Sequence, residues 1–248
     1  MTQTVEKSPS GSGLSNMAAA IAIIVCIVFG WVIWNFVLGN PNNFQNGDPA
    51  GEPNPGNLMG MMYKGGYVIA VLIGLLTTTI VFSIERFIVI GKAAGSGDVK
   101  GFVANVQSLV NSNQINEAIE ACDKQKGSVA NVVKAALVKL QEVKREGFDS
   151  DKATEAIQKE IEEATVLEMP MLEKNMIILA TLVSVGTLVG LLGTVTGMIK
   201  AFSALSTAGS PDSAALATGI SEALMNTATG IGISSLAIVF YNIFTTKI

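Results

Sequence analysis

Four apolar stretches, each long enough to cross a lipid bilayer, dominate this chain of 248 residues. The hydrocarbon core of a bilayer is about 30 Å thick, so a spanning helix needs roughly 20 consecutive apolar residues. We predict spanning helices over residues 17–39, 64–91, 174–206 and 212–248. Charged residues make up only 15% of the chain, which is too few for an ordinary soluble domain. The sequence therefore predicts an all-α polytopic membrane protein with four transmembrane helices.

The segments outside the spans differ in composition. Residues 1–16 are rich in Ser, Gly and Thr and are predicted to form a flexible tail. Residues 40–63 contain many Pro, Gly and Asn residues and are predicted as a loop. The short turn predicted at 207–211 suits a helix start, because Ser210 can cap the fourth helix and Pro211 fits its first position.

The first span is interpreted as a retained anchor rather than a cleaved signal peptide. A single base, Lys7, precedes it, and no small-residue cleavage site follows. Its apolar core is also longer than the usual ~7–15 residues of a signal peptide. The first span is thus predicted to remain part of the protein.

The polar region at 92–173 contains most of the Lys and Arg residues, and its apolar residues recur at helical spacing. Basic segments stay on the cytoplasmic side, so we predict a cytoplasmic helical layer here, with both termini also cytoplasmic. The loop at 40–63 and the turn at 207–211 are predicted on the opposite side. From Asp149 the helical pattern continues into the third span, so we expect one long helix, with a bend near Pro170 left open.

The fourth span contains an isolated carboxylate, Glu222, in the stretch "GISEALMNTATG". It lies about ten residues into the helix, which is roughly 15 Å down and near mid-membrane. A charge at such a depth is costly and usually faces a bundle interior, a water-filled path or a partner. Asn226 lies on the same helical face, whereas Thr227 projects about 140° away. Glu222 serves either ion passage or a hydrogen bond between helices.

The third span contains four glycines on one side, with threonines nearby. Small residues at spacings of three and four allow helices to approach closely. We therefore predict a packing role for this set, which comprises Gly186, Gly190, Gly193 and Gly197. Thr187 and Thr194 are nearly aligned along the helix. Their spacing is compatible with packing and with the lining of a pore.

Two motifs in these spans occur together in a known family. "GLLGTVTGM" in the third span, and "SEALMNTATG" with a later "YN" in the fourth, resemble the MotA/TolQ/ExbB proton channel family, most of all ExbB and next TolQ. The similarity covers about the last seventy residues. "IERFIVI", with Glu85 and Arg86 as an anchor where the second span leaves the membrane, is a weaker match.

The resemblance implies a proton-driven motor subunit in the bacterial inner membrane, surrounded by lipid. It implies a homopentameric ring around two helices of an ExbD/TolR-like partner, which energises outer-membrane transport through a TonB-like protein. Thr194, Thr227 and Glu222 correspond to pore residues, and Asn226 and Thr187 join them as candidates for the proton pathway. The essential aspartate of the pathway would be on the partner's helix.

Three features of this chain depart from the family pattern. Leu236 replaces a proline that usually precedes the "YN" pair, and Asn226 occupies a position that is often alanine. The span at 17–39 is additional, because ExbB and TolQ commonly have three spans. Relatives also often continue into a cytoplasmic tail beyond the position of Ile248.

Other classes of function remain open or are disfavoured. A TolQ-like or gliding-type motor subunit and a structural membrane scaffold are the alternatives. No serine–lysine dyad, paired aspartates or metal-ligand cluster lies in the spans, so we expect no enzymatic activity and no catalytic residues. The chain has no histidine, and we expect no metal or cofactor. No basic patch indicates nucleic acid.

Overall fold

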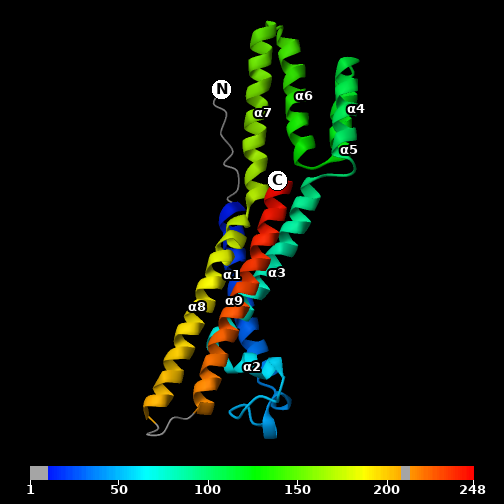
Figure 1. Cartoon of the computed structure of the whole chain (residues 1–248). Helices are drawn as coiled ribbons and strands as arrows, with labels where there is room; N and C mark the ends of the chain where they lie inside the picture. Colours follow the sequence, from blue (N-terminus) through cyan, green and yellow to red (C-terminus); the bar gives the residue numbers. More distant parts are fainter. Residues whose placement is uncertain (1–10, 208–212) are drawn as a thin grey trace. The chain divides into compact units, whose positions relative to one another are not determined.

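The computed structural model describes residues 11–207 and 213–248. These residues form helices and turns, with no strand among them (Figure 1). Four helices are long and apolar enough to span a membrane, which confirms the prediction of an all-α chain with four candidate spans. The predicted helix start at Ser210 lies outside the described residues.

The chain divides into two compact units, which are described separately. The spanning unit comprises residues 1–83 and 178–242, and the layer unit comprises residues 84–177 and 243–248. The four long apolar helices are α1 at Gly11–Val32, α3 at Tyr67–Ala93, α8 at Met176–Thr207 and α9 at Ser213–Lys247. The helix of α1 continues as a π-helical segment over Ile33–Leu38.

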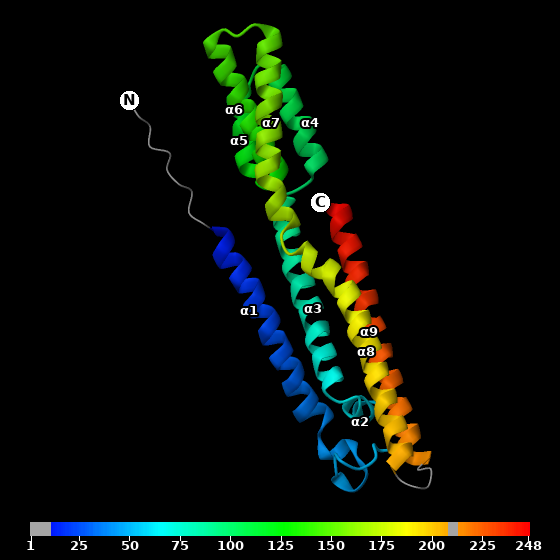
Figure 2. The same ribbon diagram turned by 90° about the vertical axis from the view of Figure 1, so that its left-hand side faces the viewer.

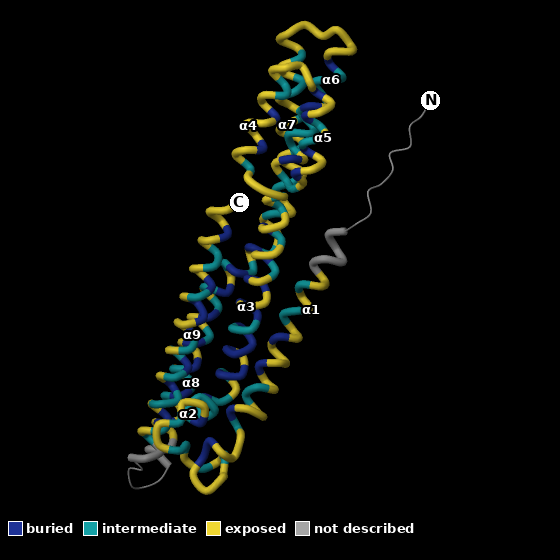
Figure 3. Tube along the Cα trace, turned by 90° about the vertical axis from the view of Figure 1, so that its right-hand side faces the viewer, coloured by how far each residue is buried: buried dark blue, intermediate teal, exposed yellow. Residues whose placement is uncertain are grey.

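Helix α1 packs against α3 in the spanning unit (Figure 2). The contact depends on Gly30, where an added side-chain carbon would lie 2.6 Å from the carbonyl oxygen of Ala70 and 2.8 Å from the Cα of Gly74. Much of the remaining surface of α1 is exposed and apolar, as expected of a lipid-facing helix (Figure 3). The helix begins at Gly11, inside the segment that the sequence predicted as a flexible tail.

The segment between the first two spans is more structured than its composition predicts. Short 3₁₀ turns cover Pro41–Asn43 and Gln45–Gly47, and helix α2 covers Leu58–Lys64. Buried Asn43 donates from Nδ2 to the carbonyl oxygens of Val37 and Leu38 at 2.9 Å each. Asn43 thereby supplements the backbone hydrogen bond from Asn40 to the carbonyl oxygen of Val37 and supplies a donor to that of Leu38 at the end of the first helix.

An aromatic stack holds α2 against the end of the first span. The rings of Trp34 and Tyr63 stack with their centroids 4.7 Å apart. Trp34 Nε1 also donates to the carbonyl oxygen of Tyr63 at 3.1 Å. We call the segment at 39–57 the interspan loop, and the end of the spanning unit where it lies the loop end.

The layer unit contains a helical layer formed by α4 to α7. The helices cover Val99–Asn111, Ile115–Gln125, Ser128–Glu146 and Ser150–Glu173. Asp98 starts α4 by accepting hydrogen bonds from the backbone of Lys100 and Gly101 at 3.0 Å each. The core is apolar and comprises Phe102, Val106, Ile115, Ala118, Cys122, Ala130 and Leu137. The predicted helical layer is therefore formed around a core of its own.

The expectation of one long helix into the third span is wrong. Helix α7 ends at Glu173, and α8 begins at Met176. Lys174 has an extended ψ of 138°, and Asn175 has a left-handed φ of 63°. Pro170 lies within α7 and does not end it. Asparagine tolerates the left-handed conformation better than most residues, which allows the interruption at this position.

Candidate functional site

Helices α8 and α9 pack along a seam of small residues. The four glycines singled out in α8 are all buried, and their nearest neighbours in space belong to α9. A side-chain carbon at Gly190 would lie 3.0 Å from the carbonyl oxygen of Asn226 and from the Cα of Gly230. At Gly197 it would lie 3.0 Å from the side chain of Ala223. Larger residues would therefore force the helices apart.

Two threonines face each other across this seam. The hydroxyl groups of Thr194 on α8 and Thr227 on α9 are in hydrogen-bonding contact. Each hydroxyl has one hydrogen, so Thr227 can donate to the carbonyl oxygen of Gly190 at 3.2 Å while Thr194 donates to Thr227. The carbonyl oxygen of Ala223 also lies 3.4 Å from the Thr194 hydroxyl. Both side chains are partly exposed. The arrangement presents two hydroxyls at one point along the seam.

Thr187 belongs to a separate contact of the same seam. Its hydroxyl donates to the hydroxyl of Ser234 on α9 at 2.8 Å. The side chain of Ser234 is buried, and Thr187 is exposed. Thr187 therefore lies on the α8–α9 contact two turns from Thr194 rather than in the threonine pair.

Glu222 is half-buried and faces away from the threonine pair. It lines a pocket of 330 Å³ between the N-terminal half of α9 and the interspan loop. Thr218 and Ser221 on α9, Lys64 on α2 and Glu52 on the loop also line this pocket. The structure thus separates Glu222 from Thr227, as the 140° difference between their directions on the helix predicts.

Glu222 lies beside the interspan loop. Residues of this loop line the same pocket as Glu222, so the carboxyl lies at the loop end of α9. Lys64 on α2 lines this pocket as well. The depth of Glu222 in a membrane stays a prediction.

Asn226 occupies the junction of three helices, one turn beyond Glu222. Its side chain is 2% exposed, and its Nδ2 donates to the carbonyl oxygen of Gly65, between α2 and α3, at 3.3 Å. A side-chain carbon at Gly193 of α8 would lie 2.8 Å from Nδ2. Asn226 thus connects α9 with the α2–α3 turn and with α8.

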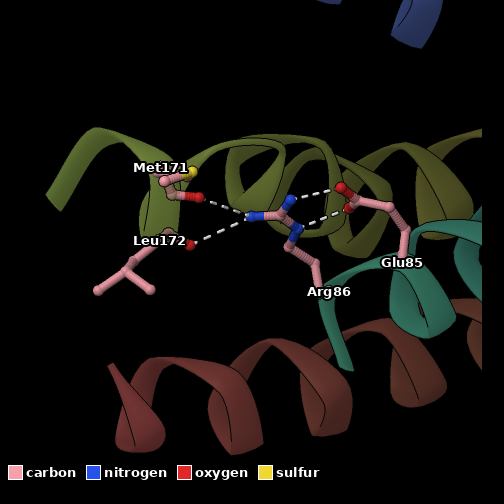
Figure 4. A network of polar contacts seen from close by, with 4 residues as sticks. All are labelled: Glu85, Arg86, Met171 and Leu172. Atoms are coloured by element: carbon pink, nitrogen blue, oxygen red, sulfur yellow. Dashed lines mark hydrogen bonds and ion pairs between the residues drawn. The ribbon is translucent and has the colours of Figure 1, made fainter. Parts of the chain in front are cut away.

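The pair Glu85–Arg86 forms a separate polar site in the layer unit (Figure 4). Arg86 is 1% exposed and is paired with Glu85, with Nε 2.6 Å from Oε2. Its Nη1 donates to the carbonyl oxygens of Met171 and Leu172 at 3.4 and 3.2 Å. These carbonyls belong to the last turn of α7, where no helical donors remain. Arg86 therefore caps the end of α7.

Sequence reasoning missed the lysine that shares the pocket of Glu222. It also did not consider Lys200, which lies in the third span. Only five residues separate α8 from α9, so positions at similar distances from this connection in the two helices are expected to lie at similar levels. Nothing in the local sequence indicates that Lys64 faces the same carboxylate, since that contact depends on the position of α2.

The residues that the structure describes contain no group of three or more His, Cys, Asp or Glu side chains that could hold a metal ion. The polar groups described along α8 and α9 are instead hydroxyls, the amide of Asn226 and the carboxyl of Glu222. Such groups can bind and pass protons or position a polar segment of a partner.

The fold and this site define a helical membrane protein with a polar seam between two closely packed spans. The pattern of the MotA/TolQ/ExbB proton channel family matches residues 124–248, which is half of the chain. The chain belongs to this family. The matched region includes α8, α9, the threonine pair and Glu222, whereas α1, the interspan loop and Arg86 lie outside it.

Similarity to individual proteins supports the same family. The chain is 34% identical over 86 residues to the biopolymer transport protein ExbB-like 3 of Synechocystis sp., covering 34% of this chain and 41% of the relative. It is 36% identical over 101 residues to the Tol-Pal system protein TolQ of Pseudomonas aeruginosa, covering 41% and 44%. It is 43% identical over 75 residues to TolQ of Haemophilus influenzae, covering 30% and 33%. Each match spans less than half of the relative.

Proposed function

We propose that this chain is the channel subunit of a proton-driven motor in the bacterial inner membrane. The observation that carries the proposal is the contact between the Thr194 and Thr227 hydroxyls, across a seam in the region that matches the proton channel family. In this proposal the chain forms a homopentamer around an ExbD-like single-span partner, whose aspartate carries the proton past the hydroxyls. The chain acts as a membrane channel and not as an enzyme.

The position of Glu222 supports a secondary role in the same pathway. Its carboxyl lies at the loop end, in a pocket with Lys64. It is therefore separated along α9 from the threonine pair by more than one turn and faces another direction. We assign Glu222 to the entry of the proton path and the threonine pair to the narrow part beside the partner's helix.

The ExbB-like version of the proposal has the motor energise TonB-dependent transport across the outer membrane. A TolQ-like role is the second candidate, and it is favoured by the identities of 36% and 43% to the two TolQ proteins. The two roles differ in the process that fails when the gene is deleted. Loss of TonB-dependent uptake supports the first role, and loss of outer-membrane integrity supports the second.

The proposal is tested by reconstituting the chain with its partner in vesicles and measuring proton uptake under an imposed membrane potential. Thr194→Val, Thr227→Val and Glu222→Ala should each reduce uptake, while native mass spectrometry still shows the pentamer. Full uptake in all three variants contradicts the proposal. Loss of the oligomer with no change in uptake per assembled complex supports a structural scaffold instead.

A further inference from the structure

The amide oxygen of Asn226 is a buried acceptor without a donor. Among the residues that the structure describes, Oδ1 of Asn226 has no hydrogen-bond partner, and it is shielded from solvent. The orientation of the amide follows from its other end, because the carbonyl oxygen of Gly65 requires the NH₂ group as its donor. An acceptor in this state costs about as much free energy as a lost hydrogen bond.

The side chain one helical turn before Asn226 can supply the missing donor. Glu222 and Asn226 are four residues apart on α9, a spacing at which side chains lie on the same face and can form hydrogen bonds. An ionised carboxylate only accepts hydrogen bonds, so it cannot satisfy Oδ1. A protonated carboxyl has one O–H group that can donate to it.

The pocket gives the Glu222 carboxyl access to water. Glu222 lines the 330 Å³ cavity at the loop end, together with Glu52 from the interspan loop and Lys64 from α2. On its pocket side the carboxyl thus faces Lys64, a cation that favours the ionised form. One turn away lies an acceptor that favours the protonated form.

We propose that Asn226 is the positioning residue for protonated Glu222, with its Oδ1 accepting the carboxyl proton in a hydrogen bond. Protonation from water in the pocket forms one O–H bond and removes one negative charge from Glu222. The new O–H group then donates to Oδ1 of Asn226. When the proton leaves, Glu222 becomes a carboxylate again, and the carboxylate interacts with Lys64 in the pocket. This inference rests on the proposed function, because it describes how a proton is held at the entry of the path.

The proposal gives Gly65 and Gly193 a specific part. Gly65 supplies the carbonyl that fixes the amide nitrogen, and the absence of a side chain at Gly193 leaves space for the amide on the α8 side. Acceptor and donor both belong to α9, and the amide of Asn226 is held in place by the α2–α3 turn and by α8. A change of proton occupancy at Glu222 therefore alters a contact where α9 meets these two segments.

The test is infrared difference spectroscopy of the channel reconstituted with its partner, recorded as the pH is lowered. The carbonyl stretch of protonated Glu222 is assigned by its loss in Glu222→Gln. In Asn226→Ala and Asn226→Leu this band should shift to higher wavenumber, because the carboxyl has lost its acceptor. Leucine keeps the volume if alanine impairs folding. The control is Thr229→Val, on the same face of α9, whose hydroxyl bonds to the carbonyl of Met225 at 2.8 Å and should leave the band unmoved.

Two results overturn the inference: an identical band in wild type and both Asn226 variants, or no protonated Glu222 band at any pH at which the complex stays assembled. Proton uptake by the same vesicles separates this outcome from failure of the proposed function. Uptake with an unmoved band contradicts only the role of Asn226. A shifted band without uptake in the wild type supports the hydrogen bond and contradicts the channel function.

Discussion

The hydroxyl groups of Thr194 and Thr227 are in contact across the α8–α9 seam, and Thr227 also donates to the carbonyl oxygen of Gly190 at 3.2 Å. The backbone of α8 thus holds the hydroxyl of α9 in place. In the proposed function, this arrangement offers two uncharged polar groups to the proton carrier of the partner. It also means that the two threonines should act as one unit.

Removal of either hydroxyl should slow proton uptake. Thr194→Val or Thr227→Val is expected to reduce the rate about tenfold, which corresponds to the loss of one hydrogen bond of about 1.4 kcal/mol. The double variant should be little slower than either single variant, because each change already removes the contact. Uptake is measured in vesicles that contain the partner.

Two further substitutions serve as controls for the threonine pair. Thr194→Ser retains the hydroxyl and should keep most of the activity. Thr187→Val removes the bond to Ser234, two turns away on the same seam, and should affect stability more than uptake. Strictly additive losses in the double variant would show that the two hydroxyls act independently.

Close packing at the seam predicts a second outcome. Gly190→Ala places a carbon 3.0 Å from both the backbone oxygen of Asn226 and the Cα of Gly230, so the helices must move apart. We expect a loss of about 1–3 kcal/mol in stability, as is typical of overpacking. The matched control is Gly232→Ala on α9, where an added carbon meets nothing within 4 Å. The control should be neutral or stabilising by up to about 1 kcal/mol.

The comparison is made by thermal unfolding in detergent and by native mass spectrometry. Gly190→Ala should lower the midpoint of unfolding and the fraction of oligomer, and Gly232→Ala should not. Equal effects of both substitutions would indicate that backbone flexibility, and not close approach, determines the role of these glycines.

Helical periodicity predicted much of the spanning unit because each span is set by its own local pattern. The apolar lengths gave the four helices, and the 100° rotation per residue separated Glu222 from Thr227 on α9. The contact between Thr194 and Thr227 depends in addition on how α8 and α9 are aligned with each other along their axes. The sequence motifs indicated both residues, and the structure shows that their hydroxyls are in contact.

Features that depend on contacts between distant segments could not be predicted. The loop composition gave no sign that buried Asn43 would hold the end of the first helix. Lys64 faces the pocket of Glu222 only because α2 lies beside α9 at the loop end. The interruption at Asn175 was missed because Pro170 is the stronger local signal, and α7 accommodates that proline.

Arg86 should be important for the stability of the layer unit. Arg86→Ala leaves two carbonyls of α7 without donors and removes the partner of Glu85. Because Glu85 remains partly in solvent, we expect a loss of about 2–4 kcal/mol, near the lower part of the range for a broken buried pair. Hydrogen exchange near the end of α7 should accelerate in parallel.

Two variants separate the charge of Arg86 from its geometry. Arg86→Lys retains the charge but cannot bond to the carboxylate and both carbonyls at once, so it should recover only part of the stability. Glu85→Gln retains the cap on α7 and should be milder than Arg86→Ala. Full stability of Arg86→Lys would show that the charge alone matters at this site.

The last prediction concerns Cys122, which lies in the core of the helical layer. Burial, followed by the negative charge of Asp123, raises the pKa of its thiol. Because the folded protein favours the neutral thiol, the contribution of Cys122 to the stability of the layer is fully present below the ordinary thiol pKa. This contribution should decline as the pH rises above about 9. Alkylation requires the thiolate, so the native protein should react more slowly with iodoacetamide than the unfolded chain does.

The measurement uses a Cys26→Ala background, so that Cys122 is the single thiol in the chain. Labelling is followed by mass spectrometry over a range of pH, in native protein and in denaturant. In a Cys122→Ala variant, stability should decline less at high pH, because the thiol no longer contributes to the decline. Equal labelling rates in the native and unfolded protein would contradict the burial of Cys122, and an unchanged decline in Cys122→Ala would assign it to other groups.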